Sequence, residues 1–273
     1  MLSIANFNMH CGMDGWGRPY DYLGSIAALA ADVVVLEECW TDADDESGGQ
    51  AGAAAAHLGY QVVAHDIGDG RRIQPQPDAD DRWIAQPSFR DRNRALYIDG
   101  IRPVRPTVTT LTRWQTAHPG RMGIAILVRP ELPIEASRIL HLHLLRADRL
   151  RRAAIVVDLT VDGRPLSVAG THMSHMLYGS PRNFAELRRR LQAEARPDAV
   201  LAGDMNAWGP VVQVCLRGWR RAIKGRSWPS WRPHSQIDHI LVRGALRPVA
   251  ARVLPDAGSD HRPVRVQLEV GPA

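Results

Sequence analysis

Short apolar runs recur along the whole chain, separated by polar turns and by a few segments with helical spacing. Buried β-strands are predicted at 2–8, 32–37, 60–65, 123–128, 153–161, 166–171, 199–202, 237–242, 249–254 and 263–270. Helices are predicted at 20–31, at 50–58 and from Ser180, a favourable N-cap ahead of Pro181. This order of elements predicts an α/β fold in which two mixed sheets pack together under a cover of helices.

Residues 66–120 interrupt this pattern with Pro, Asp, Arg and Gln, and only 95–98 and 108–111 show weak alternation. The stretch is too long for a plain connection between two elements, so we expect a functional loop region or an insertion. No linker separates two cores, and no short repeat is visible. The chain, residues 1–273, is therefore predicted to form a single domain.

Composition adds few restrictions. The net charge of +5 favours polyanionic partners such as nucleic acid or phospholipid headgroups, although an arginine-rich genome would give the same balance. Cys11, Cys39 and Cys215 lack the spacing of a disulfide framework or a structural zinc site. No apolar run is long enough to span a membrane, no secretory signal is visible and no obligate protein partner is evident. A cytoplasmic protein is expected.

Two carboxylates, Glu37 and Glu38, close the apolar run 32–37. A carboxylate buried alone at a strand end is costly, so it needs a cation or hydrogen-bond donors. Mg²⁺ would suit this position because it takes one or two carboxylates and keeps several waters for substrate oxygens. Two solvent-exposed glutamates are the alternative interpretation.

The sequence Gly203-Asp204-Met205-Asn206 follows the predicted strand 199–202. Glycine permits a tight turn, and Asp204 and Asn206, two residues apart, lie on one side of an extended segment. The carboxylate would serve as a base or metal ligand while the amide donates to a phosphoryl oxygen. An ordinary Asx turn after a strand remains the alternative.

Three histidine-containing motifs complete the set. Asp238 and His261 are predicted to form an acid–imidazole couple, in which the carboxylate fixes the tautomer and favours an imidazolium that stabilises developing phosphorane charge. His172 follows the strand 166–171 and is a better candidate for the cleft than His175. His239 points to the opposite face from Asp238, which indicates packing or surface exposure.

Together these motifs resemble, in residue type and in order, the endonuclease/exonuclease/phosphatase family, which includes pancreatic-type deoxyribonuclease, apurinic endonucleases, neutral sphingomyelinases and inositol polyphosphate 5-phosphatases. The resemblance extends from Asn8 to Val264, nearly the whole chain. Each motif is weak alone, and their common order makes the signal strong. The matching residues are Asn8, Glu38, His172, Asp204, Asn206, Asp238, Asp260 and His261.

The resemblance implies a four-layer α/β/β/α sandwich with its site at one end of the two sheets. It also implies a divalent cofactor, Mg²⁺ or Mn²⁺, bound by Glu38 with Asn8 and Asp260 near the metal. Such an ion neutralises phosphate charge, positions the phosphate and activates water.

The same resemblance implies catalytic roles for five residues. Asp204 would orient or deprotonate the attacking water, and Asn206 would hold a phosphate oxygen. His261, supported by Asp238, would stabilise the pentacovalent transition state, and His172 would line the substrate site.

One departure separates the chain from the pancreatic-type branch. There, a glutamate ahead of the strand matching 123–128 supports the histidine at the place of His172, whereas Met122 stands here. Carboxylate support of His172 is therefore not expected. Glu37 stands where several nucleases have glutamine.

The segment 219–233 mixes tryptophan with arginine and lysine just ahead of Asp238. Such mixtures stack bases and hold phosphates in single-strand binders, so Trp228 and Arg232 are predicted to contact substrate. Tryptophans packed under an ordered loop with solvated arginines are the alternative.

The leading hypothesis is a Mg²⁺-dependent nuclease-type phosphodiesterase acting on a phosphoester substrate such as nucleic acid. A phospholipid, sphingomyelin or inositol-phosphate type phosphoesterase is the first alternative. A non-catalytic binding protein of the same fold is the second, although it would have no physical need for so many clustered polar groups.

Overall fold

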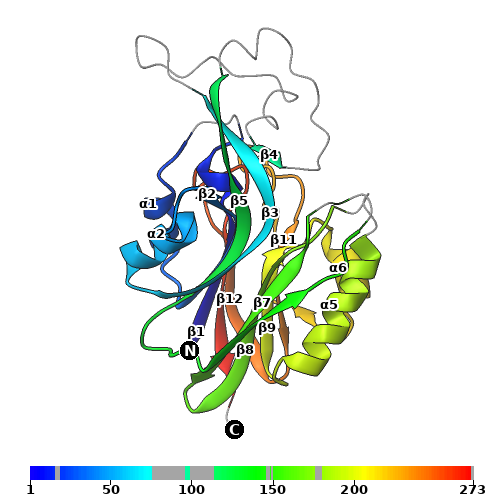
Figure 1. The fold of residues 1–273 in the computed structure, drawn as a ribbon. Helices are drawn as coiled ribbons and strands as arrows, with labels where there is room; N and C mark the ends of the chain where they lie inside the picture. The colour runs from blue at the N-terminus through cyan, green and yellow to red at the C-terminus, as the bar shows by residue number, and fades with distance from the viewer. Residues whose placement is uncertain are drawn as a thin grey trace.

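The computed structural model describes residues 1–15, 19–75, 96–98, 114–145, 148, 150–175 and 180–271. Two β-sheets pack face to face, and helices cover the outer face of each sheet (Figure 1). This is the four-layer α/β/β/α sandwich expected from the sequence. Within the described residues, no helix is long and apolar enough to cross a membrane.

The first sheet has seven strands in the order β12-β13-β1-β2-β5-β3-β4. Strands β1 and β2 run parallel, whereas the other neighbours are antiparallel. The strands are β1 (Leu2–Asn8), β2 (Val33–Asp42), β3 (Gln61–Pro75), β4 (Leu96–Ile98), β5 (Trp114–Val128), β12 (Leu246–Val253) and β13 (Val264–Val270).

The second sheet has six strands in the order β10-β11-β9-β8-β7-β6, with β8 and β9 parallel. Its strands are β6 (Ala136–His141), β7 (Ala153–Val161), β8 (Arg164–His172), β9 (Ala199–Asp204), β10 (Arg220–Arg221) and β11 (Asp238–Arg243). The helices are α1 (Tyr22–Ala27), α2 (Gly49–Leu58), α5 (Ser180–Glu194) and α6 (Gly209–Cys215), and a short 3₁₀ turn, η1, spans His10–Gly12.

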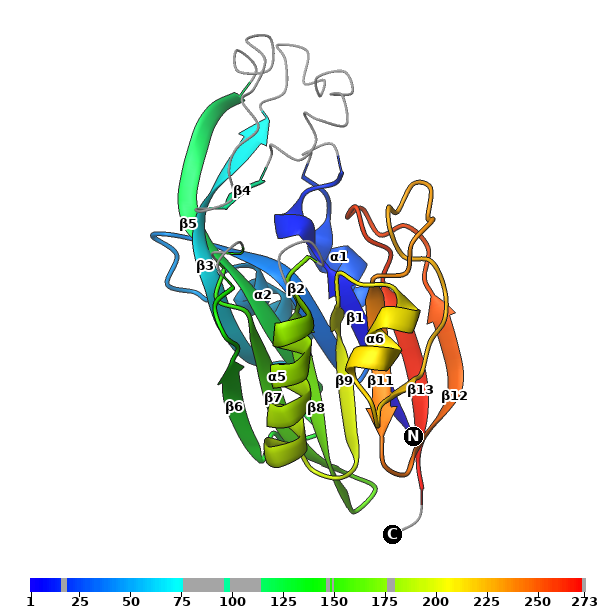
Figure 2. The same ribbon diagram turned by 90° about the vertical axis from the view of Figure 1, so that its right-hand side faces the viewer.

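Strand periodicity explains the layers, because alternate side chains point to opposite faces. Ile4 and Val35 enter the core between the two sheets, while Phe7 and Leu36 pack under α1 and α2 on the outer face. Helices α5 and α6 cover the outer face of the second sheet, as Figure 2 shows, and Phe184 is one of their buried contacts. The central strands of each sheet, such as β1 and β7, are therefore buried on both faces.

The prediction of an irregular segment at 66–120 is wrong at both ends. β3 continues to Pro75 and β5 begins at Trp114, so the two strands form a long antiparallel arm that rises beyond the body of the sheets (Figure 1). Of the weakly alternating stretches, 96–98 forms β4, while 108–111 lies outside the described residues.

Three further differences concern individual elements. α1 ends at Ala27 rather than 31, and Ala30 adopts a positive φ of 48° just beyond it. β6 and α6 were not predicted, because β6 is a largely exposed edge strand and α6 has only 7 residues. Both are too short or too exposed to produce a clear hydrophobic period.

The strand directions bring the predicted polar motifs to one end of the sandwich. β1, β8 and β9 end there, and β11 and β13, which run antiparallel to β9 and β1, begin there. Asn8, His172 and Asp204 are the last residues of their strands, and Asp238 is the first of β11. Glu38 does not close its strand as the sequence suggested: it lies at a bulge inside β2, which continues to Asp42. The topology thus gathers residues from distant parts of the sequence.

Candidate active site

Asp204 is the last residue of β9 and lies in the middle of the cluster. β9 approaches β8 very closely just before it, because a Cβ on Gly203 would stand 1.9 Å from the carbonyl oxygen of Thr171. Gly203 also has a φ of 155°. Only glycine fits here, and its presence sets Asp204 opposite His172 on β8 and Asp238 on β11.

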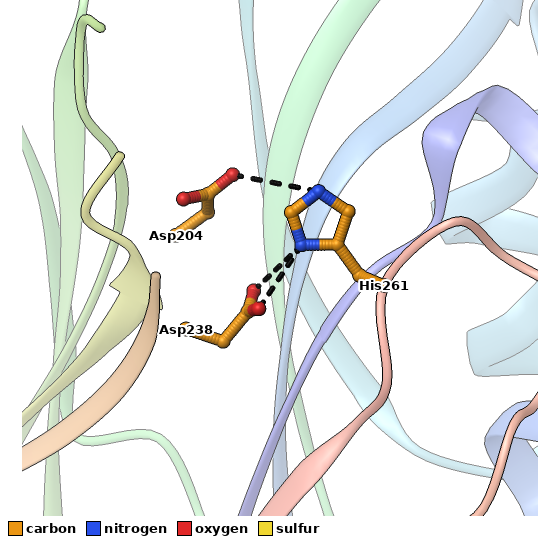
Figure 3. Close-up of side chains that lie close together, drawn as sticks. All are labelled: Asp204, Asp238 and His261. Carbon is orange, nitrogen blue, oxygen red and sulfur yellow. Dashed lines mark hydrogen bonds and ion pairs between the residues drawn. The ribbon is translucent and has the colours of Figure 1, made fainter. Parts of the chain in front are cut away.

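Asp238 and His261 form the predicted acid–imidazole couple. His261 Nδ1 lies 3.1 and 3.0 Å from the two carboxylate oxygens of Asp238. On the other side of the ring, Nε2 lies 3.9 Å from Asp204 Oδ2 and 3.8 Å from Asp260 Oδ1. Figure 3 shows the imidazole between Asp204 and Asp238. All of these side chains are buried or nearly so.

The electrostatics of this cluster give His261 and Asp204 different protonation behaviour. Burial alone would lower the pKa of His261, but Asp238, Asp260 and Asp204 outweigh it and raise that pKa well above its ordinary value. Burial raises the pKa of Asp204 to about 7, with Asp238 acting in the same direction and His261 opposing it. The arrangement therefore provides a protonated imidazole beside a carboxyl group poised near neutrality.

A β-bulge turns Glu38 into the cleft. The pairing of β2 with β5 shifts register between Glu37 and Cys39, and Glu38 has a positive φ of 52°. Asn8 Nδ2 donates to Glu38 Oε1 at 3.1 Å and to Asp204 Oδ2 at 3.2 Å. Because Asn8 Oδ1 accepts from the backbone N–H of His10, the amide presents its donor side to the two carboxylates.

Asp260 lies beside His261 and His10, with its Oδ1 3.8 Å from a ring nitrogen of each. Trp228 Nε1 donates to its Oδ2 at 3.3 Å, and the Trp228 ring packs edge-on against His234 with centroids 5.4 Å apart. Burial would raise the pKa of Asp260, but the nearby His10 and His261 outweigh it and lower that pKa.

His10 is a site residue that the sequence analysis missed. Its Nδ1 donates to Met13 O at 3.1 Å and lies 3.8 Å from Asp260 Oδ1. Burial would lower the pKa of His10, but Asp260 and Glu38 outweigh it and raise that pKa. The available signal was its position two residues after Asn8, beyond the end of a buried strand.

His172 and Asn206 interact directly. Asn206 Nδ2 lies 3.1 Å from His172 Nε2 and donates to Met173 O at 2.9 Å. The carbonyl partner fixes the orientation of the amide, so Nε2 of His172 must accept a hydrogen bond and its proton resides on Nδ1. The backbone N–H of Asn206 donates to Asp204 Oδ1, which is the Asx turn that the sequence left open.

Among the described residues, no carboxylate makes a hydrogen bond to the His172 ring, in agreement with the departure from the pancreatic-type branch. Asp204 Oδ2 and Glu38 Oε1 lie 3.7 and 3.9 Å from its Nε2. Its Nδ1 has no hydrogen-bond partner among the described residues, and Met122 is buried in the core between the sheets. Burial, Arg152 and His261 hold the pKa of His172 well below its ordinary value. His172 is therefore a neutral acceptor rather than a proton donor.

Glu37 lies between the sheets beneath the cluster and is fully buried. Neither of its carboxylate oxygens has a hydrogen-bond partner among the described residues. Burial raises the pKa of Glu37 well above its ordinary value, and Asp238 and Asp204 add to the effect. Glu37 and Glu38 are thus separated by the bulge into a buried and a cleft-facing carboxyl group.

The other residues considered from the sequence, apart from Trp228, lie away from the cluster, either buried in the core or exposed. His239 is buried, and its Nε2 donates to Ala207 O at 3.0 Å, so it packs as expected. His175 is exposed. Trp219 is buried with Arg243 over its ring, which removes it from base stacking. Arg232 is exposed on the loop that carries Trp228, with no side-chain contact to the cluster among the described residues.

The donor set fits a hard divalent cation. Glu38 and Asp260 are each 15% exposed and face the cleft, and carboxylate oxygens are the ligands that Mg²⁺ and Mn²⁺ prefer. The ligand atoms of Asp204, Asp238 and His261 also lie within 4.8 Å of one another. Within that group the Asp238 carboxylate is already hydrogen-bonded to His261.

A family model for the "Endonuclease/Exonuclease/phosphatase family" matches residues 5–261. The chain belongs to the endonuclease/exonuclease/phosphatase family. The family assignment made from the sequence motifs is thereby confirmed, and members of this family are in general phosphoester hydrolases. No curated protein sequence matches the chain significantly.

Solved structures of this family share the fold at low sequence identity. A family protein from Leptotrichia buccalis superposes with a TM-score of 0.66 at 12% identity, covering 99% of this chain and 100% of that one. The mannosyl-6-phosphatase Bt3783 from Bacteroides thetaiotaomicron gives 0.64 at 15% identity, with 99% and 100% coverage. The human Nocturnin catalytic domain, with bound sulfate, gives 0.62 at 16% identity, with 98% and 94% coverage.

Proposed function

We propose that the protein is a divalent-metal-dependent phosphodiesterase of nuclease type. The observation that carries the proposal is the placement of His261 between Asp238 and Asp204, with Nδ1 3.0 Å from the first carboxylate and Nε2 3.9 Å from the second. An imidazolium held in this way donates toward charge that develops on a phosphoryl oxygen. The neighbouring carboxylate supplies the matching base.

Asp204 is the base in this mechanism. Its pKa of about 7 lets it accept a proton from the attacking water at neutral pH. Asn8 and the backbone N–H of Asn206 hold its two oxygens in place. Attack of the water on phosphorus breaks the bond to the leaving oxygen, and the phosphoryl oxygens gain negative charge that His261 stabilises.

A Mg²⁺ or Mn²⁺ ion, when bound, would neutralise phosphate charge and activate the water. Glu38 and Asp260 would hold it. Asn8 donates to Glu38 and so orients that carboxylate, and ligation through Asn8 Oδ1 would require its amide to turn over. Trp228 orients Asp260 in the same manner.

Substrate contacts are assigned to two regions. His172 and Asn206 lie on the phosphate side of Asp204, with Nε2 of His172 3.7 Å from Asp204 Oδ2. Trp228, Arg232 and the exposed Lys224 and Arg226 form a basic, aromatic loop beside Asp260. Such a loop favours a polyanionic substrate with planar groups, which supports nucleic acid as the substrate.

A second candidate is a phospholipid or small phosphomonoester substrate. Trp208, two residues beyond Asn206, is 60% exposed, and Val214 on the same helix is 64% exposed. Exposed apolar side chains next to a phosphoester site would suit a lipid headgroup surface. One protein that shares this fold carries the name mannosyl-6-phosphatase, which indicates a sugar phosphate as its substrate.

The test is a hydrolysis panel of plasmid DNA, single-stranded oligonucleotides, RNA, sphingomyelin and sugar phosphates, each with Mg²⁺, Mn²⁺ or EDTA. Nucleic-acid cleavage that Asp204→Asn and His261→Ala abolish, and that Asp162→Asn and His141→Ala keep, is the expected result. Asp162 and His141 are exposed and lie outside the cluster. Cleavage that persists in Asp204→Asn would contradict the assigned site, and cleavage of lipid alone would favour the second candidate.

A further inference from the structure

Two buried or nearly buried networks of arginine, aspartate and serine accompany the six-stranded sheet, one just beyond the ends of β7 and β8 and one within β6, β7 and β8. In the first, Asp148 Oδ2 accepts from Arg152 Nε at 2.8 Å and from Ser174 Oγ at 2.5 Å. In the second, Asp158 accepts from Arg138 at 2.8 Å and from Ser167 Oγ at 2.6 Å. The chemistry of the two networks is the same, but their positions differ.

The Asp148 network lies at the catalytic end of β8. Ser174 follows His172 by two residues, and Arg152 Nη1 lies 3.4 Å from the carbonyl oxygen of His172. Arg152, Asp148 and Ser174 are all buried. The network therefore grips the chain on both sides of Met173, whose carbonyl accepts from Asn206 Nδ2 at 2.9 Å.

Burial of an arginine and an aspartate is a poor way to gain stability, because desolvation offsets most of their attraction. The pair is more useful for fixing geometry, since a guanidinium and a carboxylate have defined directions. His172 needs such support because its Nδ1 has no hydrogen-bond partner among the described residues. At Nε2, Asn206 Nδ2 lies at 3.1 Å, whereas carboxylate oxygens of Asp204 and Glu38 lie at 3.7 and 3.9 Å, beyond hydrogen-bond range.

We infer that Asp148, Arg152 and Ser174 are positioning residues that fix the segment 172–174, and through it the hydrogen bond between His172 and Asn206. They act on the same site as the proposed function, and their kinetic test rests on that function. Their spectroscopic test does not. The Asp158 network supplies the control because its serine, Ser167, lies on β8, the strand that carries His172, but five residues before it.

The variants are Ser174→Ala and Asp148→Asn, compared with Ser167→Ala and Asp158→Asn. Ser174→Thr, which keeps the hydroxyl, serves as the rescue. Ser174→Ala loses one buried hydrogen bond, to Asp148, whereas Ser167→Ala loses two, to Asp158 and from the Arg196 N–H. Thermal unfolding is therefore expected to show at least as large a loss in the Ser167→Ala control. Circular dichroism identifies any variant that fails to fold. If an aspartate variant does not fold, Ser174→Ala and Ser167→Ala test the positioning role instead, because the serine substitutions remove fewer interactions.

The spectroscopic readout is the ¹⁵N resonances of the His172 ring in metal-free protein. The wild type should show a single tautomer with Nδ1 protonated, as the Asn206 bond requires. Ser174→Ala should broaden or shift these resonances, Ser174→Thr should restore them and Ser167→Ala should leave them unchanged. Identical spectra in Ser174→Ala and wild type would overturn the inference.

The kinetic readout is the division between kcat and KM on whichever phosphoester the panel identifies. Misplacement of a catalytic group by about 1 Å can cost about 100-fold, so we expect kcat to fall about 10- to 100-fold in Asp148→Asn. The Asp158→Asn control should stay within about twofold. Equal losses in the two aspartate variants would show a purely structural role. If no phosphoester is hydrolysed, the proposed function fails while the spectra still decide the positioning role.

Discussion

His261 Nδ1 lies 3.0 Å from Asp238 Oδ2, and the same ring turns its Nε2 toward Asp204 and Asp260. Asp238 thus fixes both the orientation and the charge of the imidazole. We expect Asp238→Asn to lower kcat by about 10²–10⁴-fold, because the amide cannot sustain the imidazolium. Steady-state kinetics on the identified substrate would measure this. Asp256→Asn, an exposed change, is the control, and wild-type turnover in Asp238→Asn would remove the couple from the mechanism.

The pH dependence of kcat/KM follows from the two shifted groups. Asp204 must be ionised to act as a base, and burial raises its pKa to about 7, so activity should rise with pH below that point. His261 must be protonated, and its raised pKa keeps it so well above neutrality. A bound cation would stabilise the Asp204 carboxylate and move the acid limb to lower pH. A profile that falls between pH 6 and 8 would reverse the two roles.

Metal removal should abolish activity. EDTA is expected to stop hydrolysis, and Mg²⁺ or Mn²⁺ should restore it. Glu38→Gln should need a metal concentration at least about tenfold higher, because it loses a charged oxygen ligand. Metal binding also stabilises the folded state, so thermal unfolding with and without Mn²⁺ reports binding independently of turnover. An unchanged Mn²⁺ requirement in Glu38→Gln would place the ion elsewhere, with Glu186→Gln as the control for a distant glutamate.

Gly203→Ala should destabilise the protein by about 2–4 kcal/mol, because the new Cβ would meet the carbonyl oxygen of Thr171. The matched control is Gly163→Ala. Gly163 also has a positive φ, 74°, but nothing lies within 4 Å of its Cβ position. Only the backbone cost of about 1 kcal/mol should appear there. Urea unfolding of the two variants would compare these costs, and equal losses would mean that β8 and β9 separate easily.

The contribution of His239 to stability should fall in mild acid. Burial lowers the pKa of His239 to about 4, so this contribution is complete above about pH 6.5 and is lost as the pH falls toward 4. Between pH 7 and pH 5 the loss amounts to about 2 kcal/mol. Asp204, with its pKa raised to about 7, acts in the opposite direction, so the contribution of His239 is read from urea midpoints of wild type and variant at both pH values. His239→Gln, which cannot titrate, should reduce the pH dependence, whereas the exposed His141→Gln should not.

Local sequence was sufficient for the interior of the fold. β1 and β7 have the predicted bounds, because each is a continuous apolar run buried on both faces. The four-layer architecture also followed from the sequence through the family resemblance, and most polar residues predicted for the site do converge. Strand periodicity failed for the β3–β5 arm, where the two strands pair as far as Pro75 and Trp114 although the sequence shows little alternation there.

Only the tertiary structure could decide how the site is assembled. Strict alternation along β2 would point Glu38 to the outer face of the sheet, with Leu36. The bulge instead lets Glu38 contact Asn8 in the cluster. His10 and the Asp148–Arg152 pair enter through backbone turns and long-range contacts that leave no periodic trace. The sequence by itself determined which residue types end each strand. Their distances, protonation and partners arise from the packing of two sheets, because burial and neighbouring charges set them.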